Sequence, residues 1–348
     1  MTVIHSELLR RLPKAELHCH LDGSVRPETL IELGGELGVA MPCTDAEELR
    51  DYMRVDDARN LDDYLARFDV TLSVMQTADA IERVAYELSL DAARDGVRYI
   101  EIRYAPVLNV RRGLGVAEAI ESSLHGLERA ERDGGAMARV IICGLRNMSP
   151  EVSLELARLA VAYRHRGVVG FDLAGGEFGN PASLHAAAFT YAREHDLACT
   201  CHAGEGADAS SVREAVHRCG ANRIGHATRL FEDESLTQYV SDRRIALEIC
   251  LTSNVQTHAV ESYDEHPFRR YYDRGMNVVL NTDNRLMSAT TLTDEYMHAA
   301  TRLGFTFDEL CDVALNGFAS AFIPWQDRER LIAQASADIA LLRGGRGA

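Results

Sequence analysis

Short, nearly continuous apolar runs alternate along the chain with longer stretches in which apolar residues recur every three or four positions. The runs are rich in β-branched residues, a pattern typical of parallel strands that are buried on both faces. The longer stretches have the period of amphipathic helices. The pattern predicts strands at 15–22, 97–105, 138–145, 167–175, 197–204, 223–227, 245–253 and 276–283.

Signals for helix ends support this alternation. A helix is predicted over 149–167, where Ser149 and Pro150 form a typical start and Gly167 a typical stop, and another over 210–223. Eight strand–helix units predict an α/β fold, a (β/α)8 TIM barrel. An open doubly wound sheet is the alternative, but the glycines of 113–119 do not follow a strand and so make no phosphate-binding loop.

The connection between the first two predicted strands is far longer than an ordinary crossover. It covers about residues 25–95 and carries helical patterns, most clearly over 60–96. We therefore expect a helical insertion over the mouth of the barrel, within a single domain that spans residues 1–348.

Composition narrows the classes of partner. The formal net charge is -16, so the surface repels a phosphate backbone and we expect no nucleic-acid partner. The N-terminal segment lacks the apolar core of a signal peptide, and no run reaches the roughly 18 apolar residues of a membrane span. We expect no membrane association and a cytoplasmic location.

The eight cysteines include no CxxC pair, which disfavours a four-cysteine zinc site.

The segment ELHCHLDGS, residues 16–24, places His18, His20 and Asp22 at every second position. Residues two apart in a strand share a face, so we expect all three side chains to point into the barrel. Two neutral imidazoles this close suit a divalent metal ion. Taken alone, the motif is more typical of a pair of hydrogen-bonded core histidines.

Polar residues recur where later predicted strands end: His202 and Glu205 in CHAGE, His226 in RIGHA and Asp283 in NTDN. The carboxyl ends of barrel strands converge on one face, where active sites are built. The expected zinc ligands are His18, His20, His202 and Asp283. His226 is placed to orient or deprotonate a water molecule activated by the zinc, and Glu205 to deliver a proton to the substrate.

Together these motifs resemble those of the adenosine deaminase family, within the metal-dependent amidohydrolase barrels. The resemblance runs from about residue 12 to residue 325, in the family's order, through PKAELHCHLDGSVRPETL, GFDLAGGE, HAGE, RIGHATRL, EICLTSNVQT and LNTDNRL. It implies a (β/α)8 barrel that binds one zinc ion and removes the 6-amino group of a purine by hydrolysis.

The resemblance also implies roles for single residues. Glu205 would protonate N1 of the purine, and His226 would assist the attacking water, with Asp283 as the third catalytic group. The implied substrate-binding residues are His20, Asp22 at the sugar, Gly175 through its backbone, and Asn284. Residues 57–75 would form a helical wall over the pocket.

The identity of the purine is indicated by Asp22. Adenosine-acting members tend to read HxHLDG and adenine-acting members HxHLEG, and this chain reads HCHLDG. The resemblance therefore favours adenosine or 2′-deoxyadenosine, converted to the inosine form with release of ammonia. Three departures from the family pattern keep free adenine and a modified nucleoside such as aminodeoxyfutalosine open: Ala227–Thr228 in HATRL, Leu251 in CLTSN and Asn284 in TDN.

Asn284 stands where the family has a second aspartate that contacts N7 of the purine. N7 has a lone pair and no proton, so its partner must donate a hydrogen bond. An asparagine amide always carries donor hydrogens, whereas a carboxyl group donates only when protonated. The departure is therefore expected to preserve recognition of a 6-aminopurine.

Other classes of protein remain alternatives. A two-metal phosphotriester or lactone hydrolase also uses an HxH pair but needs a bridging lysine in a middle strand, and Lys14 is the only lysine here. A purine-binding relative without turnover is expected to have lost a ligand or Glu205. The sequence leaves open the oligomeric state and the choice between zinc and a metal such as iron.

Overall fold

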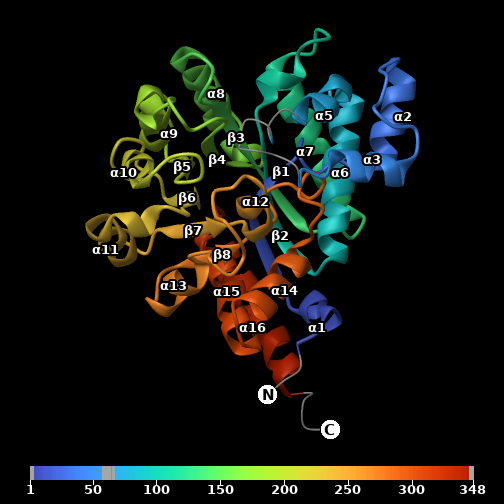
Figure 1. Cartoon of the computed structure of the whole chain (residues 1–348). Helices are drawn as coiled ribbons and strands as arrows, with labels where there is room; N and C mark the ends of the chain where they lie inside the picture. The colour runs from blue at the N-terminus through green and yellow to red at the C-terminus, as the bar shows by residue number, and fades with distance from the viewer. Residues whose placement is uncertain (1–3, 57–63, 65–66, 345–348) are drawn as a thin grey trace.

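The computed structural model describes residues 4–56, 64 and 67–344. Eight parallel strands pair in sequence order and enclose the centre of the molecule, with helices around them (Figure 1). This is the predicted (β/α)8 barrel. The strands are β1 (Lys14–His20), β2 (Val97–Tyr104), β3 (Met137–Leu145), β4 (Val168–Ala174), β5 (Ala198–Ala203), β6 (Arg223–His226), β7 (Ala246–Ile249) and β8 (Val278–Leu280).

The last two strands are shorter than the apolar runs predicted. The run 245–253 leaves the sheet after Ile249, and helix α12 (Leu251–Gln256) begins two residues later. The run 276–283 forms a strand only over Val278–Leu280. Continuous apolarity cannot mark this change, because buried strands and buried helical turns have the same composition. Both segments therefore reach the carboxyl-terminal face of the barrel as non-strand backbone.

The outer helices follow the predicted alternation. The stretch 149–167 forms α8 (Pro150–Ala162) and a short 3-10 turn, and ends at Gly167 with φ 113°. The stretch 210–223 forms α10 (Ala209–His217). The other outer helices are α7 (Val116–Arg132), α9 (Ala186–Glu194), α11 (Glu234–Asp242), α13 (Phe268–Asp273), α14 (Leu292–Arg302), α15 (Phe307–Ala319) and α16 (Trp325–Gly344), and α1 (Ser6–Arg11) precedes the first strand. Within the described residues, no helix combines the length and apolarity required to cross a bilayer.

A helical insertion lies between β1 and β2, as predicted. It contains α2 (Pro27–Leu37), α3 (Ala46–Met53), α5 (Phe68–Val74) and α6 (Ala78–Arg94). Helix α6 packs against α7 and β2, so it takes the place of an ordinary crossover helix. The predicted wall over 57–75 lies partly outside the described residues; its described part includes α5, which contributes Phe68, Asp69 and Leu72 to a central cavity.

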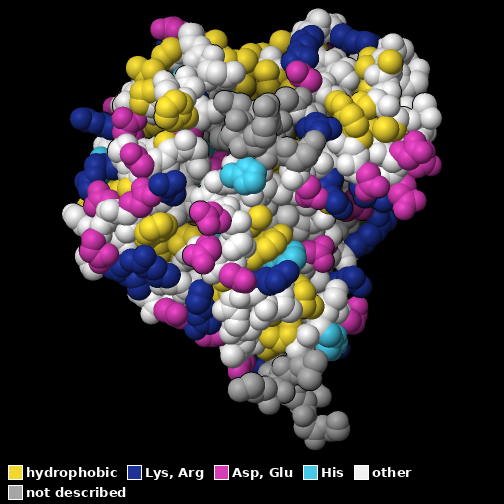
Figure 2. Space-filling model, viewed as in Figure 1, with side chains coloured by type: hydrophobic (Ala, Val, Ile, Leu, Met, Phe, Trp, Pro, Cys, Tyr) yellow, Lys and Arg dark blue, Asp and Glu magenta, His cyan; other side chains and the backbone are white. Residues whose placement is uncertain are grey.

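The surface carries charges of both signs. On the face shown in Figure 2, acidic and basic side chains lie intermixed, and neither sign forms a continuous band over the described part of that face.

The barrel closes between β8 and β1 through side chains as well as backbone. The side-chain oxygen of Asn281 accepts hydrogen bonds from the backbone N–H groups of Leu17 (2.7 Å) and His18 (3.1 Å). Backbone bonds then run from His20 N to Asp283 O (2.7 Å) and from Asp283 N to His18 O (3.0 Å). This closure holds Asp283 beside the two histidines of β1.

Replacing Asn281 by alanine is expected to destabilise the barrel. The substitution removes the acceptor of two buried backbone N–H groups, each of which costs about 1–3 kcal/mol when left unpaired. We expect the free energy of unfolding to fall by about 2–4 kcal/mol in urea denaturation. Asn222→Ala serves as the matched control, because the Asn222 oxygen accepts only one backbone N–H, from Cys199 at 2.9 Å, at an exposed position. Equal losses in the two variants would contradict this account of the closure.

Candidate active site

A cavity of about 310 Å³ opens at the carboxyl ends of the strands. His18 lies beneath it, fully buried, on β1. The other predicted site residues all line the cavity: His20, Asp22, Gly175, His202, Glu205, His226, Asp283 and Asn284. The structure therefore brings together side chains from β1, β5 and β6 and from the segments that follow β4, β5 and β8.

A cluster of nitrogen and oxygen atoms forms the floor of the cavity. One ligand atom each from His18, His202, His226 and Asp283 lies within 4.8 Å of all the others. His20 adjoins this group, with its Nε2 3.1 Å from His202 Nε2 and 3.4 Å from Asp283 Oδ1. A buried set of imidazoles with one carboxylate has the composition of a site for a divalent transition metal.

Two of these histidines have a hydrogen-bonded carboxylate on the side of the ring that faces away from the cluster, which orients the ring for metal binding. His18 Nδ1 lies 2.9 Å from Glu248 Oε2, and His202 Nδ1 lies 3.0 Å from Asp172 Oδ2. A carboxylate accepts, so the proton of each ring is on Nδ1 and the lone pair is on Nε2, facing the cluster. His18 Nε2 is buried and lies 3.2 Å from Asp283 Oδ1, but it meets the geometry of a hydrogen bond with no described residue. Lone pairs gathered in this way suit a bound cation.

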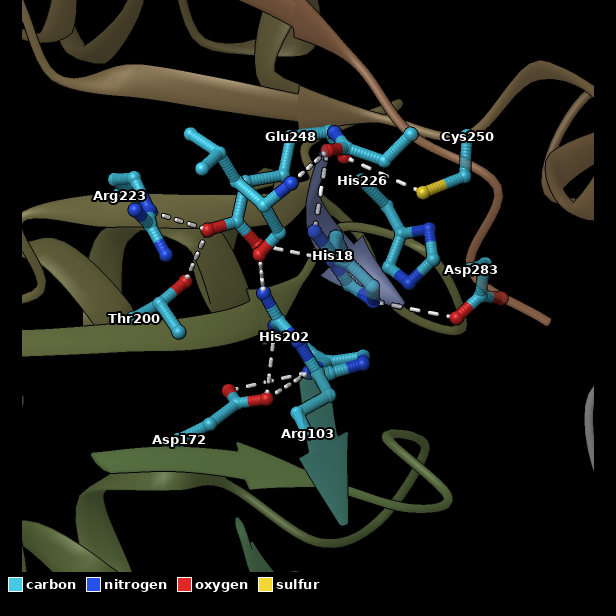
Figure 3. A network of polar contacts seen from close by, with 12 residues as sticks. His18, Arg103, Asp172, Thr200, His202, Arg223, His226, Glu248, Cys250 and Asp283 are labelled. Carbon is cyan, nitrogen blue, oxygen red and sulfur yellow. Dashed lines mark hydrogen bonds and ion pairs between the residues drawn. The ribbon is translucent and has the colours of Figure 1, made fainter. Parts of the chain in front are cut away.

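A single arginine joins the two supporting carboxylates (Figure 3). Arg103, on β2 and fully buried, donates from Nη1 to Asp172 Oδ2 (3.0 Å) and from Nη2 to Glu248 Oε2 (2.9 Å). Each of these oxygens therefore contacts both Arg103 and one histidine. Burial opposes ionisation of Glu248, but Arg103 and Arg223 beside it hold the pKa of that carboxyl well below its usual range. The two histidines are thus oriented by one connected network.

Glu205 lies at the side of the cavity, next to the cluster. Its Oε1 accepts a hydrogen bond from Thr257 Oγ1 (3.1 Å), and its Oε2 lies 3.5 Å from His226 Nε2. Burial raises the pKa of Glu205 well above its usual value, and the charges of Asp283 and Glu177 add to this. A carboxyl group in this state can carry a proton at neutral pH and exchange it with a bound molecule.

The loop that carries Glu205 is fixed by Glu177, at the end of GFDLAGGE. The Glu177 carboxylate accepts hydrogen bonds from three successive backbone N–H groups, those of Gly204 (2.7 Å), Glu205 (2.9 Å) and Gly206 (2.6 Å). These bonds account for the position of the loop.

The departures near RIGHATRL have a structural explanation. His226 and Ala227 have φ angles of 64° and 55°, in the left-handed region that favours glycine. Tyr271 donates from its hydroxyl to Ala227 O (2.9 Å), and Thr228 donates from its hydroxyl to Gly204 O. These bonds hold the strained turn without a glycine.

The residues expected to bind substrate lie in the same cavity. Asp22 is buried, its Oδ1 has no hydrogen-bond partner in the described part of the chain, and burial raises its pKa to about 7. Asn284 is also buried, and its Oδ1 is likewise without a partner among the described residues. A side chain at Gly23 would overlap the Asn284 amide, so glycine is required there. Gly175 has a φ of 93° and exposes its backbone to the cavity.

Comparison with known proteins identifies the family. The family model for adenosine deaminase matches residues 13–337. The chain belongs to the adenosine deaminase family. Adenosine deaminase 1 of Streptomyces coelicolor is 42% identical over 342 residues, covering 93% of this chain and 86% of that protein.

Solved structures agree with this assignment. The adenine deaminase of Arthrobacter aurescens has a TM-score of 0.88 at 28% identity, over 94% of this chain and 99% of that one. An amidohydrolase of Burkholderia ambifaria with bound zinc has a TM-score of 0.88 at 26% identity, over 99% of this chain and 95% of that one. The adenosine deaminase family is one of hydrolytic deaminases, so the chain is an enzyme of this type.

Several site residues were not predicted from the sequence. They are Arg103, Asp172, Glu177, Glu248, Asn254, Thr257 and His266. The segments that carry the family resemblance were the available signal for five of these residues: Asp172, Glu177, Glu248, Asn254 and Thr257. Arg103 and Glu248 sit inside apolar runs, and a charged residue in a strand otherwise buried on both faces requires a buried partner.

Arg103→Met is expected to weaken metal binding. Loss of Arg103 removes one hydrogen bond from each of the carboxylates that orient His18 and His202. Loss of such supporting bonds typically costs about 10–100-fold in metal affinity. Competition with a chromophoric chelator measures this change. Arg223→Met is the matched control, because Arg223 is also buried and bonds Glu248, but through Oε1 (2.6 Å), the oxygen that faces away from His18 Nδ1. If both variants lost affinity equally, the loss would reflect general damage to the barrel.

Proposed function

We propose that the chain is a zinc-dependent hydrolase that converts an adenine nucleoside and water to the 6-oxo purine nucleoside and ammonia. The observation that carries the proposal is the presence, in one cavity, of the histidine–aspartate cluster and the buried carboxyl group of Glu205. Adenosine and 2′-deoxyadenosine are the simplest substrates of this class.

The proposed zinc ligands are His18, His20, His202 and Asp283. When bound, zinc acts as a Lewis acid that activates water at neutral pH. Two of these ligands, His18 and His202, have a carboxylate next to Nδ1. His226, which is not a proposed ligand, has the amide nitrogen of Asn254 2.9 Å from its Nδ1 instead. This difference supports a role for His226 toward the attacking water and not as a ligand.

The reaction balances with the residues at hand. The water oxygen bonds to C6 as the bond from C6 to the amino nitrogen breaks, and the two water protons end on N1 and on the departing amino group, which leaves as ammonia. Glu205 supplies the proton to N1, a role supported by its raised pKa and its place beside the cluster. Asp283 Oδ2 accepts from Ser253 Oγ (2.6 Å), which fixes its carboxylate at the cluster.

Recognition of the substrate is divided along the cavity. His20 and Asp22, from β1 and the turn after it, are proposed to contact the sugar, and Gly175 and Asn284 the purine base. A nucleoside is favoured over free adenine because the unpartnered Asp22 oxygen offers an acceptor for a sugar hydroxyl. A screen for ammonia release with adenosine, 2′-deoxyadenosine, adenine, AMP and aminodeoxyfutalosine tests the class of substrate directly.

Glu205→Gln tests the proton donor. Glutamine keeps the shape of the side chain but cannot pass a proton, so turnover of the best nucleoside should fall by at least about 10²-fold. Metal content should stay near one equivalent, as measured by elemental analysis, because Glu205 is not a proposed ligand. Near-normal turnover would refute this role.

Asn284→Ala tests recognition of N7. A preorganised donor whose bond strengthens in the transition state is typically worth about 10²–10³-fold in rate. We expect a loss of that size in kcat/KM for adenosine and a much smaller loss for 7-deazaadenosine, which has no N7 acceptor. Equal losses on the two substrates would show that Asn284 acts on another group.

A further inference from the structure

We propose that His226 keeps its proton on Nε2 and donates it as a hydrogen bond to the attacking water, because Asn254 and His266 behind it fix this tautomer. Asn254 and His266 are then positioning residues of the reaction. The role toward water rests on the proposed function, whereas the tautomer itself follows from the contacts alone.

A backbone N–H group fixes the tautomer of His266. The N–H of Phe268, the first residue of α13, points to His266 Nδ1 at 3.1 Å. A backbone N–H can only donate, so Nδ1 of His266 is an acceptor and the proton of the ring is on Nε2. Burial lowers the pKa of His266 to about 3, which agrees with a neutral ring carrying one proton.

The next link fixes the amide of Asn254. His266 Nε2 lies 3.1 Å from Asn254 Oδ1, and the only acceptor on an amide is its oxygen. The amide therefore turns its nitrogen to the other side, where Asn254 Nδ2 lies 2.9 Å from His226 Nδ1. The two ends of an amide are normally assigned from such a network, and here the network has a fixed origin.

The last link is the ring of His226. An amide nitrogen only donates, so His226 Nδ1 accepts, and the single proton of the neutral ring is on Nε2. His226 Nε2 lies 3.5 Å from Glu205 Oε2, at the cavity. A donor hydrogen therefore faces the site of reaction.

This arrangement is the reverse of that of His18 and His202. Those two rings have carboxylates behind them and turn lone pairs toward the cluster, whereas His226 has an amide behind it and turns a hydrogen toward the cavity. A ring with hydrogen on Nε2 cannot bind a metal through that atom or take a proton from water there. His226 orients the attacking oxygen, and the proton of the water must pass to another group, for which the Asp283 carboxylate is placed at the cluster.

The decisive measurement is nitrogen NMR of the zinc-loaded enzyme with ¹⁵N-labelled histidine. Two-bond correlations between ring nitrogens and ring hydrogens distinguish the two neutral tautomers. The unmodified enzyme should show His226 with its proton on Nε2, and His226→Gln assigns the signal. A proton on Nδ1 would overturn the proposal, and this readout needs no positioning variant to fold.

Asn254→Asp reverses the direction of the hydrogen bond between residue 254 and His226 Nδ1. A carboxylate accepts from His226 Nδ1, so the proton moves to that nitrogen and Nε2 turns a lone pair to the cavity. We expect the NMR signature to switch and kcat to fall by about 10²–10³-fold, with a smaller change in KM, because the lost donor serves the transition state. Asn222→Asp is the matched control, since the Asn222 oxygen only accepts from Cys199 N, a role a carboxylate keeps, at an exposed position.

Each result bears on a different statement. If Asn254→Asp kept both the tautomer and kcat, the proposal that Asn254 fixes the tautomer of His226 would be wrong. If the tautomer switched and kcat stayed, Asn254 would position His226 without effect on the reaction, and the proposed donor role would fail. Absence of ammonia release from every adenine nucleoside would refute the proposed function, whereas the tautomer measured in the unmodified enzyme would still decide the contacts.

Discussion

The site depends on one buried interaction, the arginine Arg103 held between Asp172 and Glu248. Burying an ion pair of this kind rarely adds stability compared with well-packed apolar residues, because the cost of removing charges from water is large. The network extends to Arg223, which bonds Glu248 and Glu101, so alternating charges fill the middle of the barrel where apolar side chains would pack. The role of the interaction is to orient His18 and His202. These two metal-type ligands come from distant strands, so they need supports that hold both rings in a fixed relative position.

The same requirement explains where the backbone is strained. His226, Ala227 and Asp283 have left-handed φ angles of 64°, 55° and 61°, although none of them is glycine. Such conformations each cost of order 1–3 kcal/mol and persist only where the surroundings determine them. Here Asn281, Tyr271 and the backbone bonds between Asp283 and β1 hold the chain in place. The strain turns side chains from β6 and from the segment after β8 toward the cluster.

The sequence predicted the parts of the site that follow from local periodicity. A period of two in ELHCHLDGS was enough to place His18 and His20 on one face, and apolar runs ending in polar residues located His202, Glu205, His226 and Asp283. Arg103 could not be assigned in this way, because its partners Asp172 and Glu248 lie 69 and 145 residues away along the chain. The turn from strand to helix after Ile249 was also missed, since a buried helical turn is as apolar as the strand before it.

The turn from strand to helix after Ile249 has a chemical consequence. By ending β7 early, the chain starts α12 at Leu251 and brings Asn254 behind His226, where a longer strand would have placed it on a face of the sheet. An amide and a carboxylate are nearly the same size but impose opposite tautomers on the imidazole that they contact, because one donates where the other accepts. The division of the histidines into rings with a lone pair at the cluster and a ring with a hydrogen at the cavity is therefore set by groups that do not line the cavity. Residue type alone makes His18, His202 and His226 equivalent, and the contact behind each ring separates them.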